Sequence, residues 1–400
     1  MPWRRNVYAV TAANFLGYTG FTLVMPFLPL FIIQLGVTDV GRVALWTGLS
    51  LGVTPGLTAL LAPAWGRLGD RYGRKIMVER SLASFVVLMT AMAYVTQAWH
   101  VLALRAVQGF FAGYGSLSVA MAAESAPRER MSSAIGLVQT AQRLGPGVGP
   151  VIGGALAAVV GLRHAFVATA MFYGIALAVV FWFYDERVLA RNLEDPAVAT
   201  MAAGAVERIT FRRVLGFQNF MLMMAVIFGL QFVDRSFGPV LPLYVEQVGT
   251  AHARVPLVAG VLFSIMACTG ALGHHVCAKL LSRFAMPVVI AGGVAATAAG
   301  SALLTATANL WAMGVASTLL GIGVGAAMTA SYTAAGRVIP AGAHGAAFGV
   351  LTSASLTGMA VSPFVAGVLG GTSIRAVFFL DLVLMIALAV AVPRLMTSEP

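Results

Sequence analysis

Apolar runs long enough to cross a membrane recur along nearly the whole chain. A helix needs about 20 residues to span the roughly 30 Å hydrocarbon layer, and runs of this length follow one another from residue 7 to residue 394. Only 10% of the 400 residues are charged and 59% are hydrophobic, whereas a soluble domain carries about 25% charged residues. We therefore expect a membrane protein. Helices are favoured because the edges of an open sheet would leave backbone groups unpaired in lipid.

The runs predict an all-α membrane protein with twelve transmembrane helices. The expected spans are 7–34, 43–64, 76–95, 98–123, 133–158 and 163–184, followed by 218–245, 255–280, 285–306, 310–335, 344–369 and 374–394. Between the two groups lies the only extended polar stretch. The expected domains are a six-helix bundle at 1–184, a cytoplasmic linker at 185–213 and a second six-helix bundle at 214–400. The first run has no cleavage site for a signal peptidase and is interpreted as a retained helix.

Basic residues alternate between the two ends of the predicted spans. When successive loops are assigned to opposite sides, one side collects most of the lysines and arginines, and the other receives only Arg42, Arg163, Arg254 and Arg375. The positive-inside rule then places both termini in the cytoplasm. The net charge of +11 is explained by this topology, and no nucleic-acid partner is expected. We expect a multi-pass protein of the cell (inner) membrane that acts as a monomer.

The second half of the chain repeats the first. A shift of 212 or 213 positions aligns the prolines of the first and seventh spans, and it also aligns Gly145, Pro150 and Gly154 with Gly358, Pro363 and Gly367. Self-similarity held in one register across five helices indicates duplication. Because each half has an even number of spans, the halves share one orientation and are related by an axis along the membrane normal.

The loop after the second span carries a dense basic and glycine-rich motif, from Gly66 to Lys75. Its glycines allow a tight reversal, and Asp70 can accept hydrogen bonds from arginines or helix amides. This decapeptide resembles the signature loop of the major facilitator superfamily. The resemblance implies two rocking six-helix bundles and a cytoplasmic latch formed by Gly66, Asp70, Arg71, Gly73 and Arg74. The matching loop of the second half has Ser282 in place of the acid, so a symmetrical latch is not expected.

Two further motifs resemble patterns of drug:proton antiporters in that superfamily. In the fifth span, glycines leave one face without side chains and let another helix approach closely, and a proline removes a backbone donor and bends the axis. The motif is Gly145, Gly149, Pro150, Gly153 and Gly154. In the fourth span, Arg105 precedes Gln108 and Gly109. An intramembrane arginine costs at least about 2.5 kcal/mol unless it faces water or a partner. Arg105 therefore either serves proton transfer, as the resemblance implies, or extends to the headgroups.

Other ionisable residues lie deep in their spans: Arg143 in the fifth, and Asp234 beside Arg235 in the seventh. A desolvated carboxylic acid can load and release a proton near neutral pH, whereas an arginine cannot. Asp234 is thus a candidate proton carrier, with Arg105, Arg143 and Arg235 as coupling candidates. The alternative is a structural ion pair that keeps Asp234 ionised. Glu124, Glu246 and Asp381 are placed near helix ends.

Aromatic, methionine and amide side chains are the candidate lining of a substrate cavity. They are Tyr18, Phe21, Met25, Gln108, Tyr114, Gln139, Gln142, Phe228, Gln231, Phe232 and Tyr332. Such groups accept varied amphipathic ligands, because apolar contact is non-directional and methionine repacks easily. Each of them can equally serve ordinary packing. No metal or cofactor site and no nucleotide-binding loop is visible, so neither an enzyme nor ATP-driven transport is expected.

The resemblance covers essentially the entire chain and is closest to the branch with tetracycline and MdtG-like multidrug exporters. It implies proton-coupled efflux of small amphipathic compounds by alternating access, with the compound and protons as partners. A sugar or organic-anion carrier on the same fold is the alternative, because the three arginines could attract an anion.

Overall fold

The computed structural model describes residues 2–127, 130–185, 219–338 and 344–396, and every regular element in these ranges is a helix. The predicted linker therefore lies outside the described residues, apart from Asp185. An all-α membrane fold is confirmed.

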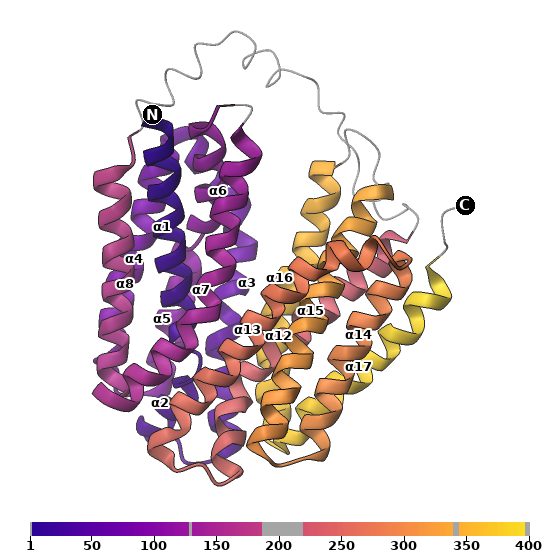
Figure 1. Ribbon diagram of the computed structural model, residues 1–400. Helices are drawn as coiled ribbons and strands as arrows, with labels where there is room; N and C mark the ends of the chain where they lie inside the picture. Colours follow the sequence, from indigo (N-terminus) through magenta and orange to yellow (C-terminus); the bar gives the residue numbers. More distant parts are fainter. Residues whose placement is uncertain (1, 128–129, 186–218, 339–343, 397–400) are drawn as a thin grey trace.

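The helices gather into two bundles that lie side by side (Figure 1). The first bundle contains α1 (Pro2–Leu23), α2 (Leu28–Gln34), α3 (Val40–Tyr72), α4 (Arg74–Met92), α5 (Ala98–Phe111), α6 (Tyr114–Ser125), α7 (Met131–Val160) and α8 (Leu162–Phe183). The second contains α12 (Phe220–Gln247), the short 3₁₀ helix η2 (His252–Arg254), α13 (Val255–Leu281), α14 (Met286–Ala306), α15 (Leu310–Val338), α16 (His344–Gly370) and α17 (Ile374–Leu395).

Nine helices within the described ranges are long and apolar enough to cross a bilayer. A tenth span results if α1 and α2, which are bent by 48° at their junction, are counted together. The helix α4 and the pair α5–α6 lie alongside these spans in the first bundle (Figure 1). That they also cross the membrane, which would complete the predicted twelve, stays a prediction. Nine of the predicted spans match helix boundaries to within three residues.

The loop expected from Gly66 to Lys75 is shorter in the structure, although the tight reversal is present. Helix α3 continues to Tyr72, and the chain turns at Gly73, whose φ of 97° suits glycine. Gly69 remains helical and lies against α6, where an added Cβ would be 2.8 Å from Leu117 Cδ2. The motif glycines thus serve close packing as well as the turn.

The fourth predicted span is interrupted. Helix α5 ends before Ala112, Gly113 adopts a φ of 124°, and α6 begins at Tyr114. The carbonyl of Phe111 accepts hydrogen bonds from Ser81 Oγ at 2.7 Å and from Arg80 Nη2 at 3.1 Å. A broken helix is tolerated in a membrane where neighbouring side chains pair the freed backbone groups. The Arg80 guanidinium also lies 3.5 Å from the centre of the Trp65 ring of α3.

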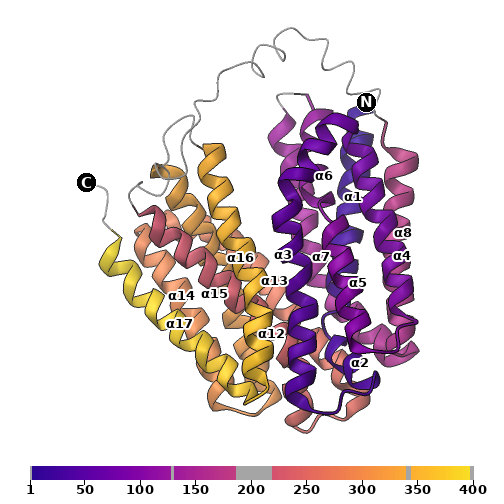
Figure 2. The ribbon, with the colours of Figure 1, turned by 180° about the vertical axis from the view of Figure 1, so that it is seen from behind.

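The two bundles approach each other at the end away from the N-terminus and diverge toward the end where the N-terminus lies (Figures 1 and 2). At the end where the bundles approach each other, α7 contacts α13. Gly260 lies against the carbonyl oxygen of Pro150, and Gly154 lies against the carbonyl oxygen of Pro256. We refer to these four residues as the α7–α13 contact.

A second contact of the same kind joins α3 to α16. Gly48 lies against the carbonyl oxygen of Pro363, and Gly367 against that of Ala44. These four residues form the α3–α16 contact. Each residue is 212 or 213 positions from its equivalent in the α7–α13 contact. The repeat read from the sequence thus appears in space as two equivalent contacts between the bundles.

The start of α1 is fixed to the end of the first bundle. Asn6 is fully buried, donates from Nδ2 to the carbonyl of Asp185 at 2.8 Å and accepts from the Asp185 amide at 3.0 Å. Arg5 adds an ion pair with the Asp185 carboxylate at 3.4 Å. The chain therefore leaves the first bundle from a point held by α1.

Candidate functional site

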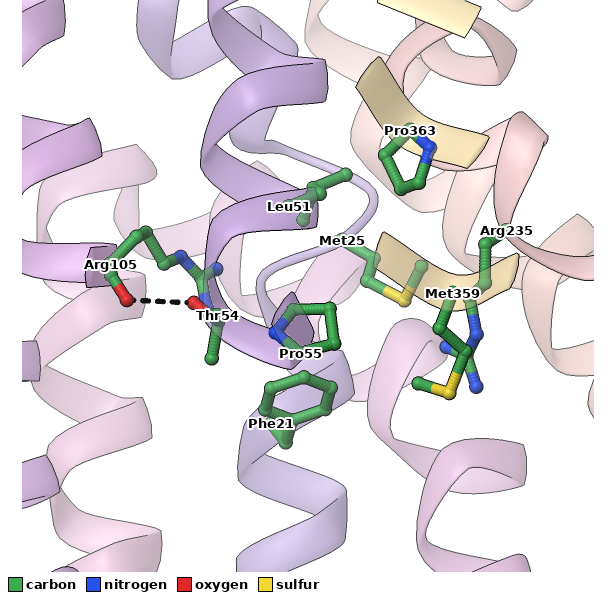
Figure 3. A pocket seen from close by; sticks show the side chains of 9 residues that line it. All are labelled: Phe21, Met25, Leu51, Thr54, Pro55, Arg105, Arg235, Met359 and Pro363. Atoms are coloured by element: carbon green, nitrogen blue, oxygen red, sulfur yellow. Dashed lines mark hydrogen bonds between the residues drawn. The ribbon is translucent and has the colours of Figure 1, made fainter. Parts of the chain in front are cut away.

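A narrow gap lies between the bundles where α1, α3, α5, α12 and α16 meet (Figure 3). Its lining residues are Phe21, Met25, Leu51, Thr54, Pro55, Arg105, Arg235, Met359 and Pro363. The free space is about 30 Å³, whereas pockets for drug-sized ligands measure roughly 300–1,000 Å³. A ligand of that size would enter only after the bundles rearrange. Phe21 and Met25 are the members of the predicted lining found here.

Arg105 enters this gap from α5 and is almost completely buried. Its side chain is 2% exposed, so it does not extend to the headgroups. Nη1 donates to Gln108 Oε1 at 3.0 Å, and among the described residues Nε and Nη2 have no hydrogen-bond partner. Thr54 Oγ1 of α3 donates to the Arg105 carbonyl at 2.8 Å, as the dashed line in Figure 3 shows. A buried guanidinium with free donors can bind an anion, or it can bind water molecules that conduct a proton.

Asp234 and Arg235 form an ion pair on α12. Arg235 Nε lies 3.1 Å from Asp234 Oδ2, and each side chain is 24% exposed. Arg235 also lines the gap, on the opposite side from Arg105 (Figure 3). The two bundles thus each contribute one guanidinium to the same narrow space. The pairing agrees with the structural alternative for Asp234 and leaves its proton-carrier role a prediction.

Arg143 does not join this group. It is an exposed residue of α7 and lies near His274 of α13 and Tyr332 of α15. His274 Nδ1 is 2.6 Å from Thr329 Oγ1. Arg143 therefore faces the second bundle and does not line the gap with Arg105 and Arg235. Gln139, one turn earlier on α7, is also exposed.

Several residues of the predicted lining pack within the first bundle. Gln142 Nε2 donates to Asn14 Oδ1 at 2.9 Å and to the Gly115 carbonyl at 3.0 Å. The rings of Tyr18 and Tyr114 are 5.6 Å apart, and Tyr114 is buried. These contacts fasten α1, α6 and α7 to one another.

The α12 members of the predicted lining lie against α16. Phe228 and Phe232 have ring centres 6.0 Å apart, and Phe232 is buried. An added Cβ at Gly358 would meet the Phe228 carbonyl and, at 3.2 Å, the Gln231 side chain. This region therefore contributes packing between α12 and α16.

The glycines of the predicted antiporter motif in α7 allow close contact with two helices, α1 and α13. Gly145, Gly149 and Gly153 lie against the backbone of α1, where any Cβ would collide with it. Gly154 and Pro150 belong to the α7–α13 contact on the other side of the helix. One motif thus holds α7 against its own bundle and against the opposite one.

Arg74 of the predicted latch, and Lys75 after it, bind within the first bundle. Arg74 Nη1 forms an ion pair with Glu124 Oε1 at 2.6 Å, and Lys75 Nζ donates to the Tyr184 carbonyl at 2.9 Å. Arg71 is exposed, with its guanidinium 5.3 Å from the Tyr72 ring centre. Of Gly66 and Asp70, the structure describes only the helical backbone.

Asp381 is a buried carboxyl that the sequence analysis placed near a helix end. It lies seven residues after Ile374, the first residue of α17, and has no exposed surface. Ser236 Oγ of α12 is 2.6 Å from Asp381 Oδ2. Distance from a helix end along the sequence did not show which face of α17 is turned inward.

Residues 10–312 and 256–400 match the family model described as Major Facilitator Superfamily. The chain belongs to the major facilitator superfamily. Members of the superfamily are transport proteins, so this chain is a multi-pass membrane transporter and not an enzyme.

Among its relatives in the superfamily is the multi-drug resistance efflux pump PmrA homolog of Lactococcus lactis, with 28% identity over 92% of this chain and 89% of the relative. The multidrug resistance protein MdtG of Dickeya zeae is 30% identical over 83% of this chain and 80% of the relative. The crystal structure of a bacterial homolog of the human lysosomal transporter Spinster, in an inward-facing and occupied conformation, superposes with a TM-score of 0.78. It covers 100% of both chains at 16% identity, which supports the shared fold.

Proposed function

We propose that this superfamily member exports small amphipathic compounds from the cytoplasm in exchange for protons, by alternating access. The observation that carries the proposal is the pair of equivalent contacts, α7–α13 and α3–α16, which join the bundles at one end while they diverge at the other. Contacts made by backbone against glycine leave few side chains to disengage. Such an interface suits two bundles that rock about a site between them.

The proposed orientation places both termini in the cytoplasm of a cell (inner) membrane, as the distribution of basic residues predicts. The two contacts then close the outer side, and the bundles diverge toward the cytoplasm. This arrangement corresponds to a state that faces the inside of the cell, and the narrow gap must still widen before a compound can bind there. The proposed domain division, with bundles at 1–184 and 214–400 around a linker at 185–213, fits the same motion.

The proposed substrate class rests on the relatives and on the lining of the gap. Relatives that share 28–30% of their residues with this chain are named for multidrug resistance or efflux. Phe21, Met25 and Met359 supply adaptable apolar contacts to the gap. Aromatic and aliphatic bodies with one polar or charged end would fit such a lining once it opens.

Proton coupling is proposed to involve Asp234 with Arg235, Arg105 and Arg143. Protonation of Asp234 would release Arg235, which lines the gap 3.1 Å from that carboxylate. The freed guanidinium would change the charge that a compound meets there. The loop with Asp70 and Arg74 is proposed to act as the latch of the opposite, outward-open state.

Transport by purified protein in liposomes tests the proposal. With a lower pH inside the liposomes than outside, protein inserted inside-out should load a fluorescent lipophilic cation and raise the internal pH in proportion. Liposomes without protein, and liposomes with the gradient collapsed by a protonophore, are the controls. Dye movement that persists at full rate without a pH gradient would contradict proton coupling.

A second candidate is a carrier of an organic anion. It is favoured by one observation, namely that Arg105 and Arg235 line the same gap from opposite bundles. Two guanidiniums in a low-dielectric gap attract a carboxylate or phosphate. If labelled organic anions are taken up and compete with dye movement, the anion carrier is favoured. If anions leave dye movement unaffected, the exporter of amphipathic compounds is favoured.

A further inference from the structure

The buried pair of Asp381 on α17 and Ser236 on α12 lies outside the gap and takes no part in the coupling proposed above. Asp381 is 0% exposed, and its Oδ1 atom has no hydrogen-bond partner in the described part of the chain. One ring stack, Phe237 against Phe378 at 5.6 Å, lies beside the pair. An ionised carboxylate in such surroundings would be strongly disfavoured unless a cation or several donors faced it.

Among the described side chains, the helices packed against α17 offer no unpaired cation. Those helices are α12, α14 and α16. Residues 286–306 of α14 and 349–370 of α16 contain no ionisable side chain. On α17 itself, Arg375 and Arg394 lie six residues before and thirteen residues after Asp381.

The ionisable groups of α12 are already engaged. Asp234 and Arg235 pair with each other, and Glu246 pairs with His252 at 2.6 Å. Tyr244 donates to the carbonyl of Thr307 at 2.6 Å. Asp381 is therefore left with the Ser236 hydroxyl as its described partner.

The two short contacts of Ser236 Oγ can both be hydrogen bonds in only one protonation state of Asp381. Ser236 Oγ is 2.9 Å from the carbonyl oxygen of Val233 and 2.6 Å from Asp381 Oδ2, yet a serine hydroxyl has one hydrogen. Both contacts are hydrogen bonds if Asp381 is protonated, because its O–H then donates to Ser236, which in turn donates to Val233. With Asp381 ionised, the single serine hydrogen serves one acceptor and the other contact is lost.

The helix that receives this hydrogen bond reaches the opposite bundle. Arg235, adjacent to Ser236, lines the gap with Arg105, and Gly238 lies against Leu51 of α3, whose Cδ1 would be 2.7 Å from an added Cβ. On its other side α12 accepts a hydrogen bond at the Phe232 carbonyl from Ser362 of α16. A change in the hydrogen bonding of Ser236 therefore affects α12, the helix that contacts α16, α17 and the first bundle.

We propose that Asp381 is a second proton-binding group of the transporter, that it holds its proton in this conformation, and that Ser236 transmits its protonation state to α12. On release, the carboxyl O–H bond breaks, the proton passes to water, and the Ser236 hydroxyl turns from Val233 to the new carboxylate. No other bond changes. The site binds H⁺ and rests on the proposed proton-coupled function, as an addition to the Asp234 group.

Infrared spectroscopy of the purified full-length protein at neutral pH tests the protonation itself. The C=O stretching band of a protonated carboxyl should be present in the wild type and in Asp234→Asn and absent from Asp381→Asn. In Ser236→Ala the band should shift in frequency, because the acceptor is removed. A band of unchanged intensity in Asp381→Asn would overturn the proposal. Asparagine preserves the size of the side chain, and a thermal unfolding curve checks that the variant folds.

A distance measurement tests the effect on α12 and needs no substrate. Spin labels at Met131→Cys and Arg337→Cys, in a background with Cys268 and Cys277 replaced by alanine, report the separation of the bundles at their diverging ends. The wild-type distance should change with pH, whereas Asp381→Asn should keep the low-pH distance at every pH. Equal pH dependence in both proteins would overturn the proposal.

The outcomes separate this proposal from the proposed function. If the wild type moves no compound under a pH gradient, proton-coupled export fails, while the infrared band still decides whether Asp381 carries a proton. If export is proton-coupled and Asp381→Asn keeps both the band and the pH-dependent distance, only the present proposal fails.

Discussion

Gly260 of α13 lies directly against the carbonyl oxygen of Pro150 in α7, so the second bundle touches the first through backbone atoms. Gly48 and Pro363 repeat this relationship between α3 and α16. Side chains added at either glycine would push the bundles apart at this end.

Gly260→Val and Gly48→Val should each shift the protein away from the conformation described here. Overpacking of this kind costs about 1–3 kcal/mol, which corresponds to a roughly 5- to 150-fold change in the ratio of two conformations. Labels at Met131→Cys and Arg337→Cys should then report shorter distances. Gly136→Val is the control, because nothing lies within 4 Å of that position. An unchanged distance between the labels in both variants would show that these contacts do not determine the ratio of the two conformations.

Arg105→Ala should abolish pH-driven export without lowering the temperature of unfolding. Arg105 is 2% exposed, and two of its nitrogens have no partner among the described residues, so its removal relieves a burial cost of at least about 2.5 kcal/mol. Arg105→Lys keeps the charge but loses the planar fork, and partial activity is expected. Rates in proteoliposomes and thermal unfolding curves measure both effects, with Arg254→Ala at an exposed position as the control. Full export by Arg105→Ala would exclude a role for this charge.

Asp234→Asn should bind substrate yet fail to accumulate it against a pH gradient. The amide cannot carry the exchangeable proton, and it leaves Arg235 without the partner found at 3.1 Å. Exchange of labelled for unlabelled substrate, which needs no net proton movement, should survive. Glu246→Gln, which alters the acid paired with His252 near the end of α12, should keep gradient-driven export. Should Asp234→Asn accumulate substrate as well as the wild type, the proton carrier lies elsewhere.

Ser81→Ala should destabilise the interruption between α5 and α6 modestly. The hydroxyl donates to the Phe111 carbonyl at 2.7 Å, and interhelical hydrogen bonds in membranes contribute about 0.6 kcal/mol on average and up to about 1.7. Unfolding in mixed detergent measures the change. Ser84→Ala is matched to it, because the Ser84 hydroxyl donates to the Ser81 carbonyl of the same helix. An equal loss of unfolding free energy in Ser81→Ala and Ser84→Ala would mean that the Ser81 hydroxyl does not stabilise the interruption.

The helices were largely predictable because hydrophobic length and turn residues act locally. Nine spans agree with the structure to within three residues at each end. The exceptions have local causes that are clear only in three dimensions. Helix α3 continues through a glycine-rich motif because Gly69 packs against Leu117, and α5 stops because Ser81 and Arg80 pair the freed carbonyl of Phe111.

The candidate site was predictable only in part, since a sequence gives depth along a helix but not the neighbour of each face. Arg105 and Arg235 were singled out because charges are rare in the spans, and the structure brings both to one gap. Asp381 was passed over because it is near a helix start, although it is fully buried. Gln142 was assigned to the lining, yet it bonds Asn14 inside the first bundle.

The double hydrogen bond between Asn6 and Asp185 determines where a pull along the chain is felt. Tension arriving at Asp185 from the following residues passes into the start of α1, and α1 rests along the glycines of α7. Force applied at Asp185 is therefore shared among α8, α1 and α7 instead of falling on the end of α8 alone.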